Sequence, residues 1–269
     1  LSLFRGVRAS LARDPYDIAA DGMGGYGRSA EPDRTPPEFP RPRPYPDRMR
    51  VGLISDVHAN LPALEAVLDD MPAVDEIVCG GDVVGYNPWP RACLERIREL
   101  TTVTVQGNHD RTVETPERYA ANRMAEAGLE HAKGKLSEEQ LEWLAALPRT
   151  ATFGEKRYLL VHSHPDRLGE YVYPRQFPEL RPYVDEYDGL VIGHTHVQHE
   201  ARIDDRLILN PGSVGQPRDG DPRAAYAVLD TETNGVDLRR VEYDVDSVRR
   251  EVLAAGLPEP VGERLSEGR

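Results

Sequence analysis

Met49-Arg50-Val51-Gly52-Leu53-Ile54-Ser55-Asp56-Val57-His58 is the stretch that decides the fold. Its apolar run is typical of a buried strand, and it ends in an Asp-x-His motif. A strand-like run followed by a polar motif occurs again at 76–82, 102–110, 157–164 and 190–196. Because polar groups that follow parallel strands meet at one edge of a sheet, we expect a layered α/β fold with its site at the strand ends.

Helical patterns separate these strands. Asn60 can cap a helix that has Pro62 in its first turn, and Ser137-Glu138-Glu139-Gln140 is a capping-box pattern. Asn234-Gly235 between two apolar runs is a strong hairpin signal. We therefore expect helices from Asn60 onward, at 90–100, twice within 116–147 and at 246–255, with hairpin strands at 224–229 and 236–241.

The composition divides the chain into three parts. Residues 1–48 are rich in Pro, Arg and Gly, with seven prolines in 31–48, and we expect a disordered leader. A linker packed on the surface is one alternative, and a biological start at Met49 is another. We expect one domain over 49–256 and a polar tail over 257–269.

Charge and cysteine use restrict the function. The net charge of −13 disfavours stable nucleic-acid binding, but it does not exclude a small phosphorylated substrate, because bound cations dominate the field inside a site. Cys79 and Cys93 do not form a CxxC pair and are expected in the core. No apolar run approaches the roughly 18 residues of a membrane span, so we expect a cytoplasmic protein without membrane contact.

The polar motifs contain the ligand types of a transition-metal site. They hold six of the eight histidines, together with carboxylates and one amide: His58, His109, His162, His164, His194 and His196. Imidazole and oxygen ligands without thiolate suit Mn, Fe, Co, Ni or Zn better than Ca or Cu(I). These residues predict a metal-dependent hydrolytic enzyme.

In this order the motifs resemble those of the calcineurin-like metallophosphoesterases. That family has D-x-H, G-D, G-N-H-[D/E], a later His and G-H-x-H, and all five blocks occur here within about residues 50–245. The resemblance implies a four-layer αββα sandwich with a two-metal site at the carboxyl ends of its strands. The implied ligands are Asp56, His58 and His196 for the first ion, Asn108, His162 and His194 for the second, and Asp82 as the bridge between them.

The resemblance also implies a mechanism. A hydroxide that bridges the two ions would attack phosphorus, and His109 would protonate the leaving group as a general acid. A purely structural His109 is the alternative. We expect two divalent transition-metal ions, with Mn first and Ni, Co, Fe or Zn as alternatives.

Four further residues are candidates for the surroundings of the site. Asp110 is expected to orient a neighbouring group, and Asn60 either supports the site or only caps its helix. His164 either lines the substrate mouth or has no role. Arg218, in a loop with Gly212 and Gly215 that can expose backbone N–H groups, either contacts phosphate or belongs to a simple connection.

One difference in the Gly-Asp motif argues against a protein phosphatase. Protein Ser/Thr phosphatases of this superfamily have G-D-x-x-D-R, in which the second Asp orients the catalytic His. Here the run is Gly81-Asp82-Val83-Val84-Gly85-Tyr86, so that Asp and the Arg are missing and the orientation of His109 needs another explanation. The run is similar to that of the short archaeal and bacterial phosphodiesterases.

The predicted function is hydrolysis of small phosphodiesters or nucleotides. The alternatives are a phosphomonoesterase and a metal-binding interaction scaffold of the same fold. A DNA nuclease is disfavoured by the acidic charge and by the short chain beyond residue 245. The expected partner is a small phosphorylated substrate, and a homo-oligomer is also considered.

Overall fold

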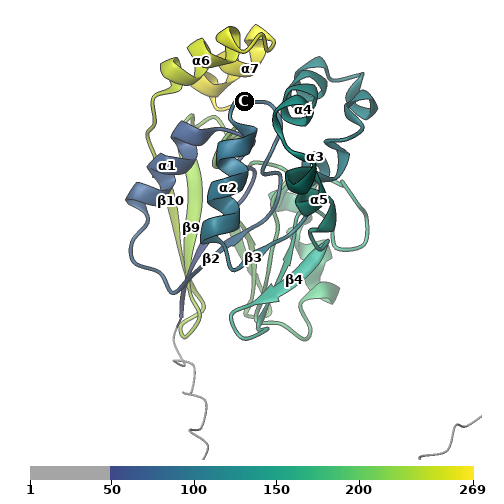
Figure 1. The fold of residues 1–269 in the computed structure, drawn as a ribbon. Coiled ribbons are helices and arrows are strands. Elements are labelled where there is room, and N and C mark those ends of the chain that lie inside the picture. The colour runs from purple at the N-terminus through teal and green to yellow at the C-terminus, as the bar shows by residue number, and fades with distance from the viewer. Residues whose placement is uncertain (1–48) are drawn as a thin grey trace, which may run out of the picture. The chain divides into compact units, whose positions relative to one another are not determined.

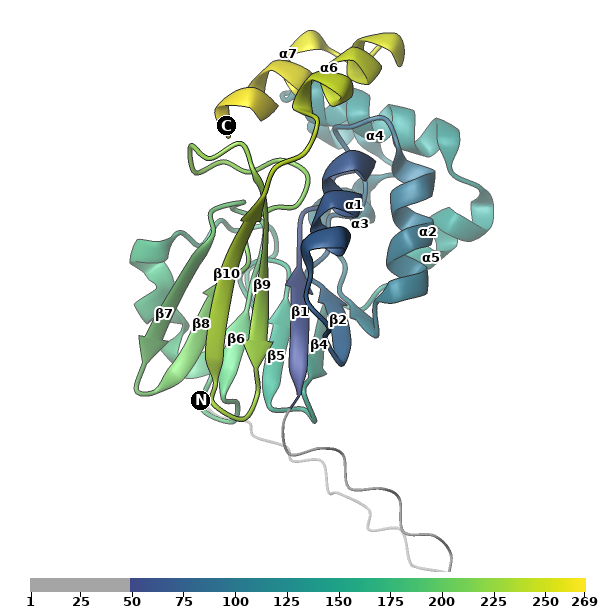
Figure 2. The same cartoon turned by 90° about the vertical axis from the view of Figure 1, so that its left-hand side faces the viewer.

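Two five-stranded sheets face each other in the computed structural model, which describes residues 49–269 (Figure 1, Figure 2). The predicted leader at 1–48 lies outside the described residues. The first sheet has the order β10-β9-β1-β2-β3, with β1 (Arg50–Ile54), β2 (Glu76–Cys79), β3 (Val103–Thr104), β9 (Ala224–Asp230) and β10 (Gly235–Val241). The second has the order β4-β5-β6-β8-β7, with β4 (Thr150–Phe153), β5 (Tyr158–Val161), β6 (Gly189–Val191), β7 (His199–Ile203) and β8 (Arg206–Asn210).

The strand β1 is buried on both faces, as its apolar sequence predicts. Val51 and Leu53 point between the sheets, in one cluster with Leu160 and Leu209 of the second sheet. On the other face, Gly52 lets Met71 pack closely, because a Cβ there would lie 2.6 Å from Sδ of Met71 and would push that side chain aside. The expected strand is confirmed.

Helices cover the outer face of the first sheet (Figure 1). The layer contains α1 (Leu61–Asp70), α2 (Pro90–Leu100), α4 (Arg123–Lys135) and α5 (Glu138–Ala146), and shorter helices, α3 (Asn108–Thr112) and the 3-10 helix η1 (Pro116–Tyr119), precede α4. The capping box of Ser137 and Gln140 is confirmed. The short helix α3 was not predicted, because its five residues are too few for a hydrophobic period to be visible.

The outer face of the second sheet is covered by the 3-10 helix η2 (Pro174–Tyr183), whose Phe177 and Leu180 are buried against β6 and β8. Pro178 and Pro182 lie inside this segment and remove backbone donors that an α-helix would need. The layered α/β sandwich is therefore confirmed, with a 3-10 segment in its fourth layer.

The C-terminal residues correct one expectation. The predicted polar tail at 257–269 contains α7 (Glu259–Glu263) and the 3-10 helix η3 (Arg264–Glu267) after α6 (Val245–Ala254). Val261 and Leu265 are fully buried, in a cluster with Tyr86. The tail prediction was wrong because Leu257, Val261 and Leu265 recur every four residues, which is the period of an amphipathic helix, and this face packs against Tyr86.

No helix within residues 49–269 combines the length and the apolar character needed to cross a membrane.

We predict that Leu265→Ala lowers the free energy of unfolding by about 2–5 kcal/mol, because it leaves a cavity under the C-terminal helices. Leu253→Ala, at a leucine of α6 that is 54 % exposed, is the matched control and should change stability by less than about 0.5 kcal/mol. Urea unfolding of both variants measures the difference. Equal effects would contradict the packing of this segment.

Candidate metal centre

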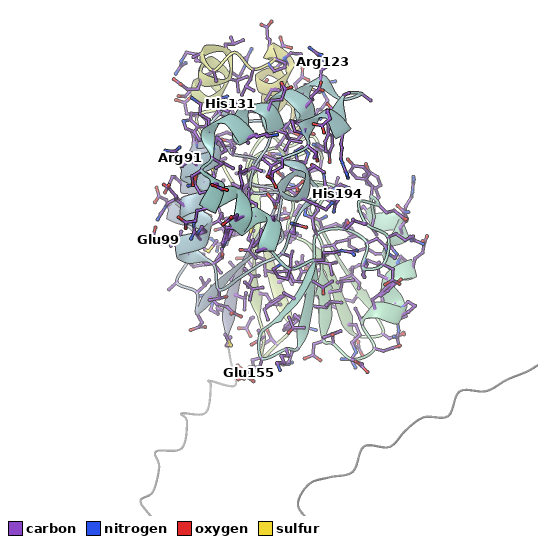
Figure 3. The ribbon with its side chains drawn as sticks, turned by 45° about the vertical axis from the view of Figure 1, so that its right-hand side comes forward. Arg91, Glu99, Arg123, His131, Glu155 and His194 are labelled. Carbon is purple, nitrogen blue, oxygen red and sulfur yellow. The ribbon has the colours of Figure 1, made fainter. Side chains whose placement is uncertain are left out.

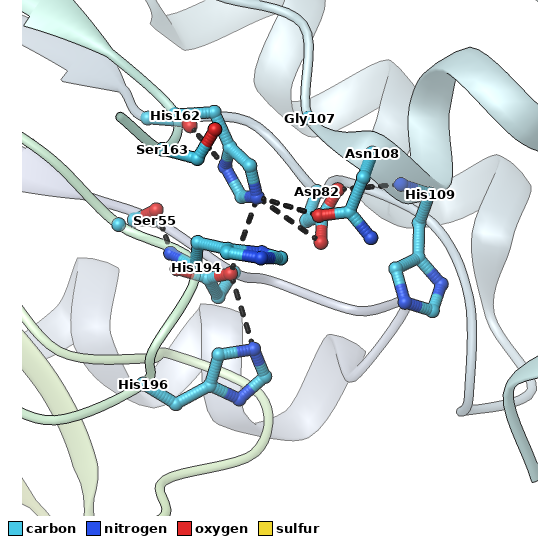
Figure 4. Close-up of polar contacts among 12 residues, drawn as sticks. Ser55, Asp82, Gly107, Asn108, His109, His162, Ser163, His194 and His196 are labelled. Atoms are coloured by element: carbon cyan, nitrogen blue, oxygen red, sulfur yellow. Dashed lines mark hydrogen bonds and ion pairs between the residues drawn. The ribbon is translucent and has the colours of Figure 1, made fainter. Parts of the chain in front are cut away.

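Backbone hydrogen bonds hold the ends of neighbouring strands together. The N–H of Asp56 donates to the carbonyl of Gly81 at 2.9 Å, and that of His58 donates to the carbonyl of Asp82 at 2.9 Å. In the second sheet, the N–H of Gly193 donates to the carbonyl of His162 at 2.9 Å. The polar motifs that follow β1, β2, β5 and β6 therefore meet at one place (Figure 4).

Several of these residues adopt a left-handed backbone conformation that is rare without glycine. Their φ angles are 54° at Asp56, 47° at His58, 53° at Asp82, 69° at His194 and 60° at His196. Such conformations cost about 1–3 kcal/mol each and persist where the surroundings impose them, most often at functional sites. Here they turn the side chains out of the strand direction and toward a common centre.

The first group of candidate ligands is Asp56, His58 and His196, all buried. Nε2 of His196 lies 3.1 Å from Oδ1 of Asp56 and 3.0 Å from Nε2 of His58. Nε2 of His58 lies 3.8 Å from the same carboxylate oxygen. Three donor atoms therefore face one another at distances that suit a shared cation.

The second group contains Asp82, His162 and His194. Nε2 of His162 lies 3.4 Å from Oδ2 of Asp82 and 3.0 Å from Oδ1 of Asn108 (Figure 4). Oδ2 of Asp82 also lies 3.7 Å from Nε2 of His58, so this carboxylate lies between the two groups. The hydroxyl of Tyr119 accepts from Nδ2 of Asn108 at 2.5 Å, which turns the amide oxygen toward the centre.

In four histidines, a backbone carbonyl binds the ring nitrogen that points away from the centre. Because a carbonyl only accepts, each nitrogen that contacts one carries the hydrogen, and the opposite nitrogen keeps its lone pair for a metal. The contacts are His58 Nδ1 with Val84 (3.2 Å), His162 Nδ1 with Gly80 (2.7 Å), His196 Nδ1 with Gln216 (2.6 Å) and His194 Nε2 with Gly169 (3.0 Å).

This arrangement fits divalent cations. Without them, buried polar atoms have no partner, which lowers the stability of the folded state. The lone pairs on Nε2 of His58 and His196 face each other, and the buried Oδ1 of Asp56 has no hydrogen-bond partner among the described residues. Burial lowers the pKa of His58 and of His196, which favours their neutral, metal-ligating form. Although burial opposes it, His196 and His162 hold the pKa of Asp56 below its usual range.

A proton and a metal compete for His162. Burial is the largest single effect and lowers the pKa of this histidine, but the charges of Asp82 and Asp56 and the hydrogen bonds to Asp82 and Gly80 together raise it to about 10. Burial likewise lowers the pKa of His194 to about 4, and the charge of His162 adds to this effect. Once a metal replaces the proton on His162, the two groups supply neutral imidazole, carboxylate and amide oxygen, the donor set expected from the sequence.

Asp110 holds the loops that carry Asp82 and Asn108. Its Oδ2 accepts from the N–H groups of Asp82 (2.7 Å) and Gly107 (3.0 Å), and its Oδ1 accepts from those of Val83 (2.9 Å) and Val84 (3.3 Å). The side chain contacts backbone rather than the other candidate ligands. Asp110 therefore holds the backbone of these loops, and its role at a metal site stays a prediction.

His109 is held by packing. Its ring lies 4.8 Å from the ring of Tyr86 and 5.1 Å from that of Tyr119, and a Cβ at Gly85 would overlap its Nδ1. Thus Gly85, with φ of 98°, provides the space where the protein phosphatases have an Asp. Among residues 49–269, Nδ1 of His109 has no hydrogen-bond partner, and burial lowers the pKa of the ring to about 4. His109 also forms a possible ligand group with His58 and Asp82, so distance alone does not decide its role.

Asn60 and His164 lie outside the candidate ligand groups. Oδ1 of Asn60 caps α1 by accepting from Ala63, and its Nδ2 donates to the carbonyl of Gly215 at 2.9 Å. Nδ1 of His164 accepts from the N–H groups of Asp166 and Arg167 at 3.2 Å, which stabilises its own turn. His164 also lines a cleft that borders Asn108 and His162.

Arg218 lies at the edge of the centre. Its guanidinium donates to Oε1 of Gln216 at 2.7 Å and to the hydroxyl of Tyr86 at 3.3 Å, and its Cζ lies 5.7 Å from the Tyr86 ring. Its backbone N–H donates to the carbonyl of His196 at 3.1 Å. The loop therefore places the charge of Arg218 beside the centre and supports the backbone of the candidate ligand His196.

Aromatic residues around the centre were mostly missed by the sequence reasoning. Tyr86, Tyr119 and Tyr171 surround it, and Tyr171 stacks on His194 at 4.1 Å between ring centroids. In Figure 3 His194 lies between the helical layer and the second sheet, whereas the exposed Arg91, Glu99 and Arg123 lie at the surface. Of the three tyrosines, only Tyr86 stands in a motif that the sequence analysis quotes, and no role was predicted for it. Tyr86 adjoins the Gly-Asp block, which could have signalled its position.

The fold and this donor set define a metallophosphoesterase type of sandwich. The sequence model of the calcineurin-like phosphoesterase superfamily domain matches residues 49–234. The chain therefore belongs to this superfamily, and its membership supports a hydrolase that binds divalent metal.

Individual relatives agree with this assignment. An uncharacterized protein from Methanocaldococcus jannaschii is 34 % identical over 238 residues, which cover 81 % of this chain and 98 % of the relative. Phosphodiesterase YfcE from Escherichia coli is 29 % identical over 201 residues, covering 70 % of this chain and 91 % of YfcE. The crystal structure of a metallophosphoesterase from Sphaerobacter thermophilus has a TM-score of 0.73 and 37 % identity, and it covers 82 % of this chain and 100 % of its own.

We predict that Gly85→Ala lowers the free energy of unfolding by about 1–3 kcal/mol, because the methyl group overlaps His109 at a positive φ. Chemical denaturation measures the loss, and the ring signals of His109 in NMR spectra should shift.

Gly134→Ala in α4 is the matched control, since nothing lies within 4 Å of the added Cβ. It should leave the histidine signals unchanged and keep or slightly raise stability. If Gly85→Ala were equally well tolerated, packing would not be what orients His109.

Proposed function

We propose that this protein is a binuclear metal-dependent phosphoesterase that hydrolyses small phosphodiesters or nucleotides. Asp56, His58 and His196 would hold one ion, Asn108, His162 and His194 the other, and Asp82 would bridge them. The proposal includes a cytoplasmic location and Mn as the first candidate metal. Two such ions would supply an acidified water as the nucleophile and neutralise charge on the phosphoryl oxygens.

One observation carries the proposal. The lone pairs of His58 and His196 converge on a buried carboxylate oxygen of Asp56 that has no hydrogen-bond donor among the described residues. Asp82 lies within 4 Å of histidines from both groups, which is the position that a bridging ligand requires. Mixed imidazole and oxygen donors without thiolate favour Mn, Fe, Co, Ni or Zn.

His109 is proposed as the proton donor rather than as a ligand. In each of the four histidines proposed as ligands, the ring nitrogen that points away from the centre is hydrogen-bonded to a backbone carbonyl. This is the usual support of a metal ligand. Nδ1 of His109 has no such partner in the described chain, so the ring is not oriented as a ligand. A phosphate anion beside the ring would favour its protonated form and thereby prepare it to donate to the leaving oxygen.

Arg218 is proposed to bind the phosphoryl oxygens of the substrate. Its partners Gln216 and Tyr86 are neutral, so the guanidinium keeps its full charge for an anion. The hydrogen bonds from Arg218 to Gln216 hold it beside the centre before substrate binds.

A metal-binding scaffold and a phosphomonoesterase remain the alternatives. The scaffold predicts metal binding without turnover. A phosphomonoesterase predicts faster hydrolysis of p-nitrophenyl phosphate than of bis-p-nitrophenyl phosphate. The similarity to phosphodiesterase YfcE favours the diester, and the two chromogenic substrates distinguish these functions directly.

We predict that His109→Ala keeps its bound Mn but loses about 10²–10⁴-fold in turnover, because it removes only the proton donor. The deficit should be larger for a dinucleotide than for bis-p-nitrophenyl phosphate, since p-nitrophenolate leaves without protonation. Metal content by mass spectrometry and steady-state rates provide the two measurements.

His58→Ala is the matched comparison, and it should lose metal as well as activity. Metal loss in His109→Ala would make His109 a ligand and contradict the proposed role. Absence of metal-dependent turnover by the wild type on any phosphoester would overturn the enzyme proposal.

We also predict that chelation of the metal lowers the thermal midpoint and that Mn restores it. The unliganded centre buries opposed lone pairs and an unpartnered carboxylate oxygen, so each ion stabilises the folded state. At a free concentration 100 times its Kd, an ion contributes about 2.7 kcal/mol per site. Differential scanning calorimetry with and without EDTA measures this shift, and an unchanged midpoint would argue against metal at this centre.

A further inference from the structure

Two tyrosine rings continue from the candidate metal centre toward the surface. The ring of Tyr171 lies on the imidazole of His194, with 4.1 Å between the ring centroids and an angle of 18° between the planes. The ring of Tyr173 is nearly parallel to that of Tyr171, at 16°, and its centroid lies 6.1 Å away. Three rings of similar orientation therefore begin at His194, which lies among the other candidate ligands (Figure 4).

The two tyrosines belong to an exposed apolar patch. Tyr171 is 45 % exposed and Tyr173 is 41 % exposed, and Leu168 of the same segment is 50 % exposed. Within residues 49–269 five large hydrophobic side chains are exposed, and these are three of them. Single exposed hydrophobic residues are ordinary, whereas a cluster of them beside a functional site is typical of a surface that binds something.

The segment that carries the tyrosines is held in place. The carbonyl of Gly169 accepts from Nε2 of His194 at 3.0 Å. Val172, between the two tyrosines, is 3 % exposed and packs in the cluster that covers the second sheet. The exposure alternates along Tyr171-Val172-Tyr173, as in an extended segment, so the burial of Val172 turns both tyrosines to the opposite, open side.

The size of the patch suits a planar ligand group better than a second copy of this chain. Half-exposed side chains of this kind offer roughly 300 Å² together, whereas a stable dimer interface buries about 800 Å² per partner. The patch also starts on a candidate metal ligand. A group attached to a phosphoryl at the metals therefore lies within its reach.

We propose that Tyr171 and Tyr173 bind a planar aromatic group of the substrate beside the metal centre. The inference rests on the proposed phosphoesterase function and names its substrate class: a phosphoester that carries a nucleobase. Aromatic side chains bind bases by stacking, which tolerates different bases because every base has a π face. The two tyrosines then determine specificity without ligating metal.

The test compares the binding of AMP and ribose 5-phosphate, which differ in the base, to the full-length, Mn-loaded protein by calorimetry. We expect the wild type to bind AMP more tightly by about fivefold or more, the gain from stacking one base. Tyr173→Ala should reduce this ratio to below about twofold by weakening AMP alone, and Tyr173→Phe, which keeps the ring, should retain it. Tyr173 is substituted because Tyr171 lies against a candidate ligand.

Tyr187→Ala is the matched control. It removes the same side chain just before β6, at the opposite end of that strand from His194, and should preserve the ratio. Equal binding of both ligands by the wild type, or an unchanged ratio in Tyr173→Ala, would overturn the aromatic site. A wild type that is dimeric by light scattering and becomes monomeric in Tyr173→Ala would also overturn it, because the patch would then be a contact between copies.

The underlying function is tested separately by hydrolysis of bis-p-nitrophenyl phosphate by the wild type. If that hydrolysis fails while the preference for AMP still depends on Tyr173, the catalytic proposal is wrong and the aromatic site remains. If hydrolysis occurs without any preference for AMP, the catalytic proposal remains and the aromatic site is wrong.

Discussion

The Asp110 carboxylate is the interaction on which the candidate site depends most. It accepts hydrogen bonds from the backbone of Gly107 and of residues 82–84, and so joins the loops after β2 and β3. Those loops carry Asp82, Asn108 and His109. Because Asp82 in turn accepts from the backbone N–H of His109 at 2.8 Å, the carboxylates fix each other through the backbone. Burial and the nearby charge of Asp82 raise the pKa of Asp110 to about 7, and the N–H donors oppose this rise.

The electrostatic balance of the centre explains why its donors require cations. Four histidines have one nitrogen fixed by a carbonyl and turn the other toward a buried space that also contains two carboxylates. In a low-dielectric interior these groups repel each other or remain unpartnered unless positive charge is added. The strained φ angles of Asp56, His58 and Asp82 show that the backbone tolerates a cost to keep this arrangement.

Packing replaces a charged partner at His109. Where the protein phosphatases have an orienting Asp, this chain has Gly85, and the imidazole lies against the backbone of Gly85 and the rings of Tyr86 and Tyr119. The same Tyr86 is covered by the C-terminal helices, so a segment that contributes no candidate metal ligand still helps to position the ring. This gives the C-terminal segment a structural role at the centre.

The sequence alone determined the strands that end in polar motifs, the sandwich class, the Asn234-Gly235 hairpin and the superfamily, because local periodicity and motif order are written along the chain. It also identified every residue of the two candidate ligand groups, whose roles remain predictions. Only the tertiary structure decided that residues 257–269 bury Leu265 against Tyr86 and that tyrosines surround the centre. These features depend on contacts between residues that are far apart in sequence, and no local pattern encodes which distant surface will cover a short apolar face.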